Sequence, residues 1–448
     1  MNAIQITEPV YNQKQMSLTV LPEGHMYKEK IRSGQPFLYR EGGISSMVME
    51  LRMKDDVGGL SLNRALQKTL LRYPYFTHRM IRKEGDFYLV KNPLPFIAVE
   101  SAQLRPLGGP QTNHHLIDVT YDKKVIFISF HHGLCDGRGI MPFVRTLIYY
   151  YCTEKYGRQF EVQGVRLNGE PLLPGETKEP FHFDNLKADR AGMPEIRKNG
   201  FALPDSVGSV GENRFYRCEI KISREDFVKF AKENNGTPAV TAALLLAKAI
   251  NNLYPEEEQP VMCNLASDLR KGIDLENTFK NCVGSVSFPY TKKLDKMPLS
   301  GQAASFREAV ADHKKTDNLR KEIIKNAFIC DKLDEMHSYK EKKEWIAFFN
   351  HLISNTFLLS YVGPLNLGEC EACMESVHMY GSGTPGLSLQ MMSAGEYITL
   401  NVMQSFQTDK YIRAFAKVLT ETGVDYSLSG LFEFSTPRDS LCLQSDRR

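Results

Sequence analysis

His131-His132-Gly133-Leu134-Cys135-Asp136-Gly137 places two histidines at the end of an apolar run and a carboxylate just before a sharp turn. The run before it, residues 125–130, is short and rich in β-branched and aromatic side chains, which predicts a buried strand. After the turn, apolar residues recur at the spacing of one helix face from Ile140 to Tyr151. The histidines therefore lie at a strand-to-helix junction, which holds side chains rigidly and leaves them reachable.

The pattern HHxxxDG, with an apolar strand before it and an apolar helix after it, resembles the signature of the CoA-dependent acyltransferase superfamily. This group includes chloramphenicol acetyltransferase, plant BAHD acyltransferases, wax-ester and alcohol acyltransferases, and nonribosomal peptide condensation domains. The chain is most similar to the bacterial alcohol acetyltransferase-like and wax-ester branch. The resemblance implies an α/β fold (an α+β sandwich) of two chloramphenicol acetyltransferase-like domains, with the active-site channel at their interface.

The resemblance also implies roles for the residues of the motif. His132 corresponds to the general base, and His131 is an adjoining packing or orienting residue. Asp136 points away from the substrate and pairs with a distant arginine, for which Arg270 is the candidate because it follows a buried strand. A surface arginine after a strand is the alternative reading of Arg270. Gly137 forms the turn.

A second landmark, Ser360-Tyr361-Val362-Gly363-Pro364-Leu365, resembles the SNxGP-type segment of the wax-ester and alcohol acyltransferase branch. The match is partial, because Tyr361 replaces the expected asparagine and the BAHD counterpart DFGWG is absent. Ser360 is the candidate for stabilising the oxyanion, with Gly363 in a supporting position. Simple packing within a strand is an equally good reading of Ser360.

The chemistry of acyl transfer agrees with a histidine at this place. A hydroxyl or amine that attacks a thioester must lose its proton, and imidazole titrates near neutral pH. Most adjacent histidines are structural, and the chain holds a second pair, His114-His115, with Asp118 nearby. In that pair the aspartate is one residue closer and no glycine follows, so we interpret it as ordinary.

Three other patterns are weaker. Cys135 occupies a variable position of the motif, so a Cys-His nucleophile is not favoured. Cys370 and Cys373 form a lone CxxC without a second pair, which argues against a metal site. Residues 381–386 match GxGxxG by letters, but Pro385 leads into a strand-like run and predicts a loop rather than a dinucleotide site.

Length and composition set outer limits. A chain of 448 residues predicts two domains, and 42% hydrophobic with 24% charged residues predicts a globular protein. A net charge of +3 gives no reason to expect nucleic acid as a partner. No signal peptide or apolar run of about 18 residues occurs, so no membrane span is predicted. Nine scattered cysteines are typical of free thiols in a reducing cytoplasm, where we place the protein.

Periodicity predicts mixed sheet and helix in both halves of the chain. Between them, periodicity fades in a stretch rich in proline, glycine and charge. The predicted division is an N-terminal acyltransferase domain at 1–165, a crossover linker at 166–212 and a C-terminal acyltransferase domain at 213–448. The predicted strands are 78–82, 87–90, 116–120, 125–130, 215–222, 261–266, 387–392 and 397–403. The predicted helices are 62–71, 237–251 with Thr237 as its N-cap, a segment over 303–351 broken near Lys315 and near His337, and one capped by Asp409 that ends at Thr422.

These observations predict an enzyme that transfers an acyl group from acyl-CoA, acetyl-CoA included, to an alcohol or amine in a ternary complex. Acyl-CoA is a co-substrate, and neither a tightly bound cofactor nor a metal is expected. One alternative is a stand-alone condensation-type enzyme that takes its acyl group from the phosphopantetheine of an acyl carrier protein. A second alternative is a non-catalytic binding module with the same fold.

Overall fold

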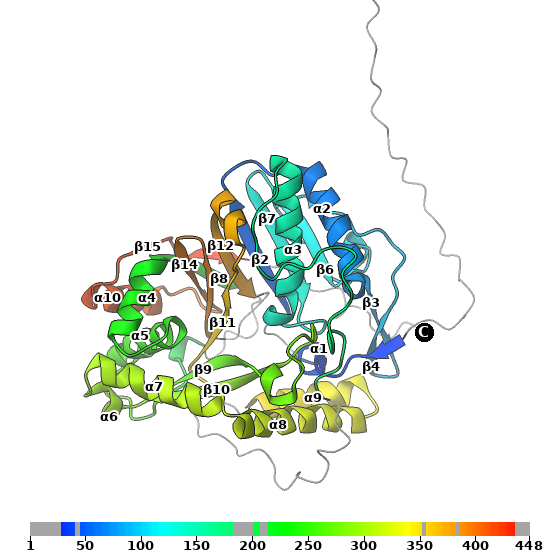
Figure 1. Ribbon diagram of the computed structural model, residues 1–448. Helices are drawn as coiled ribbons and strands as arrows, with labels where there is room; N and C mark the ends of the chain where they lie inside the picture. Colours follow the sequence, from blue (N-terminus) through cyan, green and yellow to red (C-terminus); the bar gives the residue numbers. More distant parts are fainter. Residues whose placement is uncertain are drawn as a thin grey trace, which may run out of the picture.

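The structure, a computed structural model, describes residues 28–40, 45–181, 200–206, 214–351, 355–381 and 386–434. Two large sheets stand side by side, and helices cover their outer faces (Figure 1). The strands are β1 (Lys28–Lys30), β2 (Ser46–Met53), β3 (Arg79–Lys83), β4 (Asp86–Val90), β5 (Val99–Glu100), β6 (Ile117–Asp122), β7 (Val125–His131), β8 (Phe215–Ser223), β9 (Val261–Asp268), β10 (Val283–Tyr290), β11 (Phe357–Pro364), β12 (Met374–Gly381), β13 (Leu387–Ala394), β14 (Tyr397–Gln404), β15 (Tyr426–Leu428) and β16 (Phe432–Phe434). The α-helices are α1 (Gln35–Leu38), α2 (Gly59–Arg72), α3 (Gly137–Tyr156), α4 (Arg224–Glu233), α5 (Pro238–Leu253), α6 (Lys292–Asp295), α7 (Leu299–His313), α8 (Thr316–Glu335), α9 (Tyr339–His351) and α10 (Lys410–Glu421).

The first large sheet has the strand order β12-β2-β7-β6-β5. Helices α2 and α3 pack side by side on one face of it (Figure 1). Their apolar stripes meet the sheet in one core, to which α2 contributes Leu62 and Leu66, α3 contributes Phe143 and Leu147, and β7 contributes Ile128. The helix predicted at 62–71 and the strands predicted at 116–120 and 125–130 are confirmed within a few residues.

Strand β12 comes from the far end of the chain and completes this first sheet. It pairs antiparallel with β2, so that Val377 lies opposite Leu51 and Met379 opposite Met49. The side chains of Val377 and Met379 enter the same core as α2 and α3. The two halves of the chain therefore share a sheet.

The second large sheet has the order β10-β9-β11-β13-β14-β8-β15, with β16 also pairing β8. Helix α5 lies against this sheet, and the side chain of Thr237 caps it by accepting from the backbone N–H of Val240, as predicted. The long helical segment is broken after His313 and after Glu335, near the breaks predicted from the sequence. Asp409 does precede α10, but its carboxylate pairs with Arg413 instead of capping the helix.

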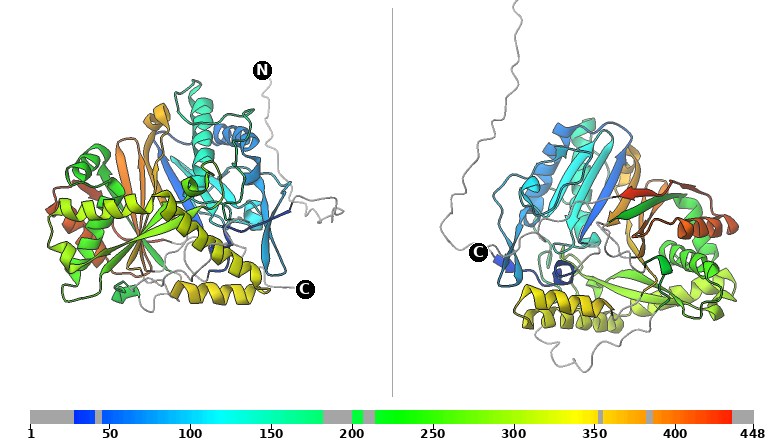
Figure 2. Two further views of the ribbon diagram at one scale, coloured as in Figure 1. Left: turned by 60° about the horizontal axis from the view of Figure 1, so that its bottom comes forward. Right: turned by 180° about the vertical axis from the view of Figure 1, so that it is seen from behind.

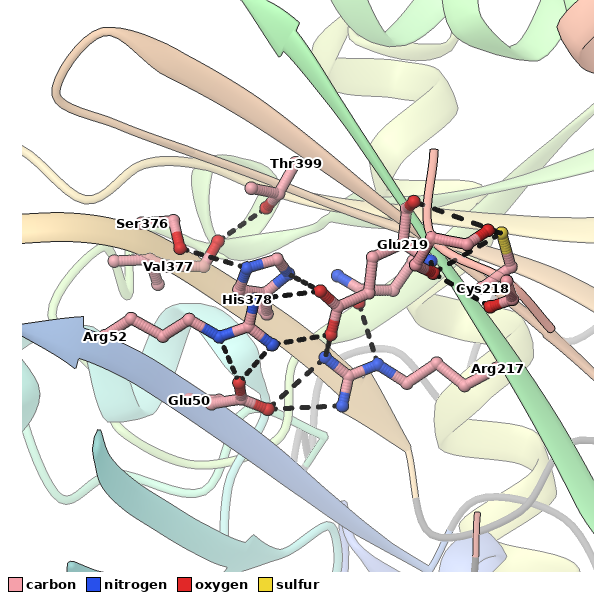
Figure 3. Close-up of polar contacts among 12 residues, drawn as sticks. Glu50, Arg52, Arg217, Cys218, Glu219, Ser376, Val377, His378 and Thr399 are labelled. Atoms are coloured by element: carbon pink, nitrogen blue, oxygen red, sulfur yellow. Dashed lines mark hydrogen bonds and ion pairs between the residues drawn. The ribbon is translucent and has the colours of Figure 1, made fainter. Parts of the chain in front are cut away.

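A buried network of ion pairs joins the two sheets (Figure 3). Glu50 and Arg52 on β2 face Arg217 and Glu219 on β8: Arg217 Nη1 donates to Glu50 Oε2 at 3.2 Å, and Arg52 Nη2 donates to Glu219 Oε1 at 2.7 Å. Burial raises the pKa of the Glu50 carboxyl, but Arg217 and Arg52 outweigh it and hold that pKa below its usual value. His378 of β12 lies beside this network, where burial lowers its pKa to about 4.

Two stretches of interest lie partly outside the described residues. Residues 382–385 of the loop predicted at 381–386 are not described, nor are residues 182–199 and 207–213 of the predicted crossover. Across the described part of the chain, every helix is too short or too polar to cross a membrane.

Candidate functional site

The motif forms a tight turn between β7 and α3. His131 is the last residue of β7 and is buried, and its Nδ1 accepts from the backbone N–H of Gly133 at 2.9 Å. The backbone N–H of Leu134 donates to the carbonyl of His131 at 2.9 Å. The N–H of His132 donates to the carbonyl of Ser45, the residue just before β2, at 2.7 Å. His131 thus stabilises the turn on which the next side chain stands.

Asp136 begins α3 and is saturated with donors. Its Oδ1 accepts from the backbone N–H of Gly139 at 2.7 Å, which caps the helix, and from Arg270 Nη2 at 2.8 Å. Its Oδ2 accepts from the backbone N–H of Cys282 at 2.7 Å. The structure therefore brings Asp136 and Arg270 together across 134 positions of sequence. These contacts tie the motif of the first sheet to the segment between β9 and β10 of the second.

Arg270 is itself fully engaged. It is 2% exposed, and besides Asp136 it donates to the carbonyls of Thr278 and Lys280 and to Asp268. Burial disfavours its charge, but the carboxylates of Asp136 and Asp268 outweigh burial and hold the pKa of Arg270 above its usual value. An ion pair so completely hydrogen-bonded fixes geometry, because removing either partner leaves a buried charge uncompensated.

His132 is half-buried, with one ring face covered. The ring of Phe37, from α1, stacks on it with centroids 4.1 Å apart and planes 6° from parallel. Burial lowers the pKa of His132 to about 4; the carboxylate of Asp136 opposes this shift, while the positive charge of Arg40 adds to it. The ring is therefore neutral at physiological pH, the form that can accept a proton.

Asn281 contacts both the ring and the backbone of His132. Its Nδ2 donates to the carbonyl of His132 at 2.9 Å and lies 3.0 Å from the ring Nδ1. An amide nitrogen only donates, so the Asn281 Nδ2 contact favours the tautomer with the ring proton on Nε2. The backbone carbonyl of His132 itself favours the tautomer with the proton on Nδ1. A base that acts through Nε2 requires the tautomer with the proton on Nδ1. Asn281 is 1% exposed and precedes β10, so His132 lies where the two sheets meet.

The segment Ser360–Leu365 reaches the motif, but through a residue other than Ser360. A Cβ placed on Gly137 would lie 2.4 Å from Val362 Cγ1, so only glycine allows this approach. Gly363 has φ of +93°, at the point where the register of β11 with β13 shifts. Ser360 is half-buried within β11, opposite Gln390 of β13.

The other candidate groups are less suited to chemistry. Burial raises the pKa of the Cys135 thiol well above its usual value, so it is protonated and a poor nucleophile. Cys370 is buried and Cys373 half-buried, and no group of three metal-ligating side chains occurs within the described ranges. In the second histidine pair, the His115 ring stacks on Phe96 and bonds to backbone carbonyls, as expected of a structural residue.

Three residues near His132 were not predicted from the sequence: Phe37, Arg40 and Asn281. Phe37 is 95 positions away from His132, and Asn281 is 149 positions away. Neither belongs to a spacing pattern, and no local signal distinguishes them from other aromatic or amide residues. Only the packing of α1 and of the β10 approach against the motif identifies them.

Comparison with known proteins places the fold. No family model and no curated protein matches the chain. Among solved structures, polyketide synthase associated protein 5 from Mycobacterium tuberculosis has a TM-score of 0.58 at 13% identity and covers 88% of this chain and 98% of its own. TRI101 of F. sporotrichioides, solved with coenzyme A and T-2, has a TM-score of 0.57 at 11% identity over 89% and 99%. The first condensation domain of the CDA synthetase has 0.58 at 12% over 90% and 99%. The chain therefore has the fold shared by these three structures, which confirms the predicted fold class.

Proposed function

We propose that the protein transfers an acyl group from acyl-CoA to the hydroxyl or amino group of a small acceptor. The observation that carries this proposal is the neutral ring of His132, held at the junction of the two sheets by Phe37 and Asn281. A site between the two large sheets suits a reaction with two substrates, since each substrate can enter from its own side. We infer an active-site channel at this junction, between an N-terminal domain at 1–165, whose sheet β12 completes, and a C-terminal domain formed by the rest of 213–448.

In the proposed mechanism His132 acts as the general base. Nε2 takes the proton of the acceptor as its oxygen or nitrogen attacks the thioester carbonyl. The tetrahedral intermediate then collapses, the carbon–sulfur bond breaks, and the departing thiolate takes the proton back from the imidazolium. Asp136 and Arg270 are positioning residues in this scheme, because they hold the turn without facing the reacting atoms. Ser360 stays a candidate for stabilising the oxyanion.

The identity of the acyl donor distinguishes an acyl-CoA-dependent transferase from a condensation-type enzyme. The full chain, incubated with an acceptor panel of alcohols and amines, is expected to release free thiol from acetyl-CoA, detected with a thiol reagent and by mass of the product. Condensation domains share the fold, so the same panel is offered with an acetylated carrier protein. Turnover with the carrier protein alone would favour the condensation-type enzyme. Absence of turnover with both donors, across several acyl chain lengths, would favour a binding module.

The pH dependence of activity tests the base. Burial disfavours the charged ring, so the pKa of His132 falls to about 4 and the ring stays neutral at pH 5 and 6. We expect kcat/KM with an alcohol acceptor to decline only below about pH 5, with an acid limb near 4 instead of the about 6.5 of an ordinary histidine. Circular dichroism at each pH separates loss of fold from protonation. A limb near 6.5 would contradict the enclosed ring.

A further inference from the structure

Beside the candidate base lies an arginine that has no counter-ion among the described residues. Arg40 follows α1, and its guanidinium carbon is 5.3 Å from the centre of the Phe37 ring, which in turn stacks on His132. Its Nε is buried and has no hydrogen-bond partner, and no ion pair is formed with any carboxylate of the described residues. The residue is half-buried overall.

The three arginines that are fully buried within the described residues are all paired. Arg72 donates to both oxygens of Glu176, Arg217 to Glu50, and Arg270 to Asp136. A guanidinium stays charged at any accessible pH, and burying a charge without a partner costs free energy. Burial lowers the pKa of Arg40, and no carboxylate of the described residues opposes that shift. Arg40 therefore carries an unbalanced positive charge in the described structure.

The position of Arg40 is fixed relative to the motif. A Cβ on Gly34 would lie 2.2 Å from the carbonyl oxygen of Gly133, so the chain entering α1 packs backbone to backbone on the turn after His132. Leu38 of α1 contacts the same turn, since its Cδ2 lies 2.7 Å from a Cβ built on Gly133. Figure 2 shows α1, in dark blue, near the junction of the two large sheets. The ring of Phe37 therefore contacts both the guanidinium of Arg40 and the ring of His132.

We propose that Arg40 binds a carboxylate of the acyl acceptor, so that the acceptors are hydroxy acids or amino acids. This inference rests on the proposed acyl transfer. An anion at Arg40 must belong to the part of a substrate that lies close to His132. The phosphates of coenzyme A are separated from its sulfur by the whole pantetheine arm, which places them too far away. A guanidinium offers paired N–H donors that match a carboxylate. The alternative source of a carboxylate at Arg40 is the acyl donor, when its acyl group comes from a dicarboxylic acid, as in succinyl-CoA.

The test uses matched acceptors that differ only in charge. The pairs are 4-hydroxybenzoate with methyl 4-hydroxybenzoate, 3-hydroxybutyrate with its ethyl ester, and leucine with leucinamide. For the wild-type protein with acetyl-CoA, kcat/KM is expected to favour the carboxylate of an accepted pair by about 10- to 100-fold, the value of one charged hydrogen-bonded contact. In Arg40→Gln this preference is expected to fall towards parity, and Arg40→Lys should retain part of it.

Arg158→Gln is the matched control. Arg158 also lies over a phenylalanine, Phe160, at 3.8 Å, but it is exposed and pairs with Glu369. This variant should keep the wild-type preference. Equal use of charged and neutral acceptors by the wild type would overturn the proposal. So would an equal loss for both members of each pair in Arg40→Gln, because that result would mean that Arg40 only supports Phe37.

Two further arms separate this inference from the proposed reaction. Arg40→Gln could change the preference for succinyl-CoA over butyryl-CoA while the preference between charged and neutral acceptors stays unchanged. In that case the carboxylate belongs to the donor, and the proposal is wrong. Calorimetric titration of the same carboxylates into wild-type and Arg40→Gln protein needs no turnover. Arg40-dependent binding without turnover would contradict acyl transfer and support the carboxylate site. Absence of both binding and turnover for every carboxylate would overturn the site.

Discussion

Replacing His132 with alanine is expected to lower kcat for acyl transfer by about 100- to 10,000-fold, the usual contribution of a positioned general base. The ring is neutral at the pH of the assay because burial lowers its pKa to about 4, so it is ready to accept a proton. Its removal also deprives Phe37 of its stacking partner. His132→Gln is therefore made in parallel, since glutamine fills more of the space and still cannot act as a base.

The chain supplies a matched control for this substitution. His114→Ala changes the first residue of the other histidine pair, and the ring Nδ1 of His114 lies 3.1 Å from the carbonyl of Gly108. We expect this variant to retain wild-type turnover. Thermal unfolding of all three variants shows whether a loss of activity reflects loss of fold. Undiminished turnover by a folded His132→Ala or His132→Gln protein, with each donor that the wild type uses, would refute the mechanism.

Removing the carboxylate of Asp136 is expected to destabilise the protein by about 3–5 kcal/mol, because Arg270 would keep its charge at 2% exposure without this partner. Loss of the helix cap at Gly139 adds about 1 kcal/mol. Arg270→Ala should destabilise the protein by a similar amount, because it leaves the Asp136 carboxylate buried without its arginine partner. Urea denaturation of the purified variants measures these differences as changes in the transition midpoint.

The double variant shows whether the two residues act as one unit. Once the aspartate is gone, removing the arginine also removes an uncompensated charge, so the double variant should lose clearly less stability than the two single losses added together. Lys315→Ala is the control, since its pair with Asp312 is largely exposed and screened by solvent, so its loss should change stability little. Additive losses from Asp136→Ala and Arg270→Ala would show that the contact carries no coupling.

Local pattern was enough to predict the parts of the fold that obey a short period. Helix α2, strands β6 and β7 and the helical segment from α7 to α9 appear where spacing and breaker residues indicated. Strands β2 and β12 were not predicted, although they pair with each other, because their partners are more than 300 positions apart and nothing local specifies that pairing. The order of strands in a sheet depends on such distant contacts.

The candidate site shows the same division. His131, His132 and Asp136 follow one another closely, so their relation to a strand end and a helix start was readable from the sequence. Phe37 and Asn281 reach the ring only through the packing of α1 and of the approach to β10. The resemblance supplied Arg270, whose contact with Asp136 the structure shows. No sequence pattern revealed that Arg40 lacks a counter-ion among the described residues.

The contribution of β12 to the first sheet also bears on synthesis of the protein. While the ribosome is still translating the middle of the chain, the edge of β2 has no neighbour, and Met49 and Leu51 lack the apolar cover that Met379 and Val377 later supply. An unprotected strand edge is prone to pair with other chains. The nascent N-terminal half is therefore expected to depend on chaperones until residue 381 has emerged, and a fragment ending before β12 should aggregate when expressed alone.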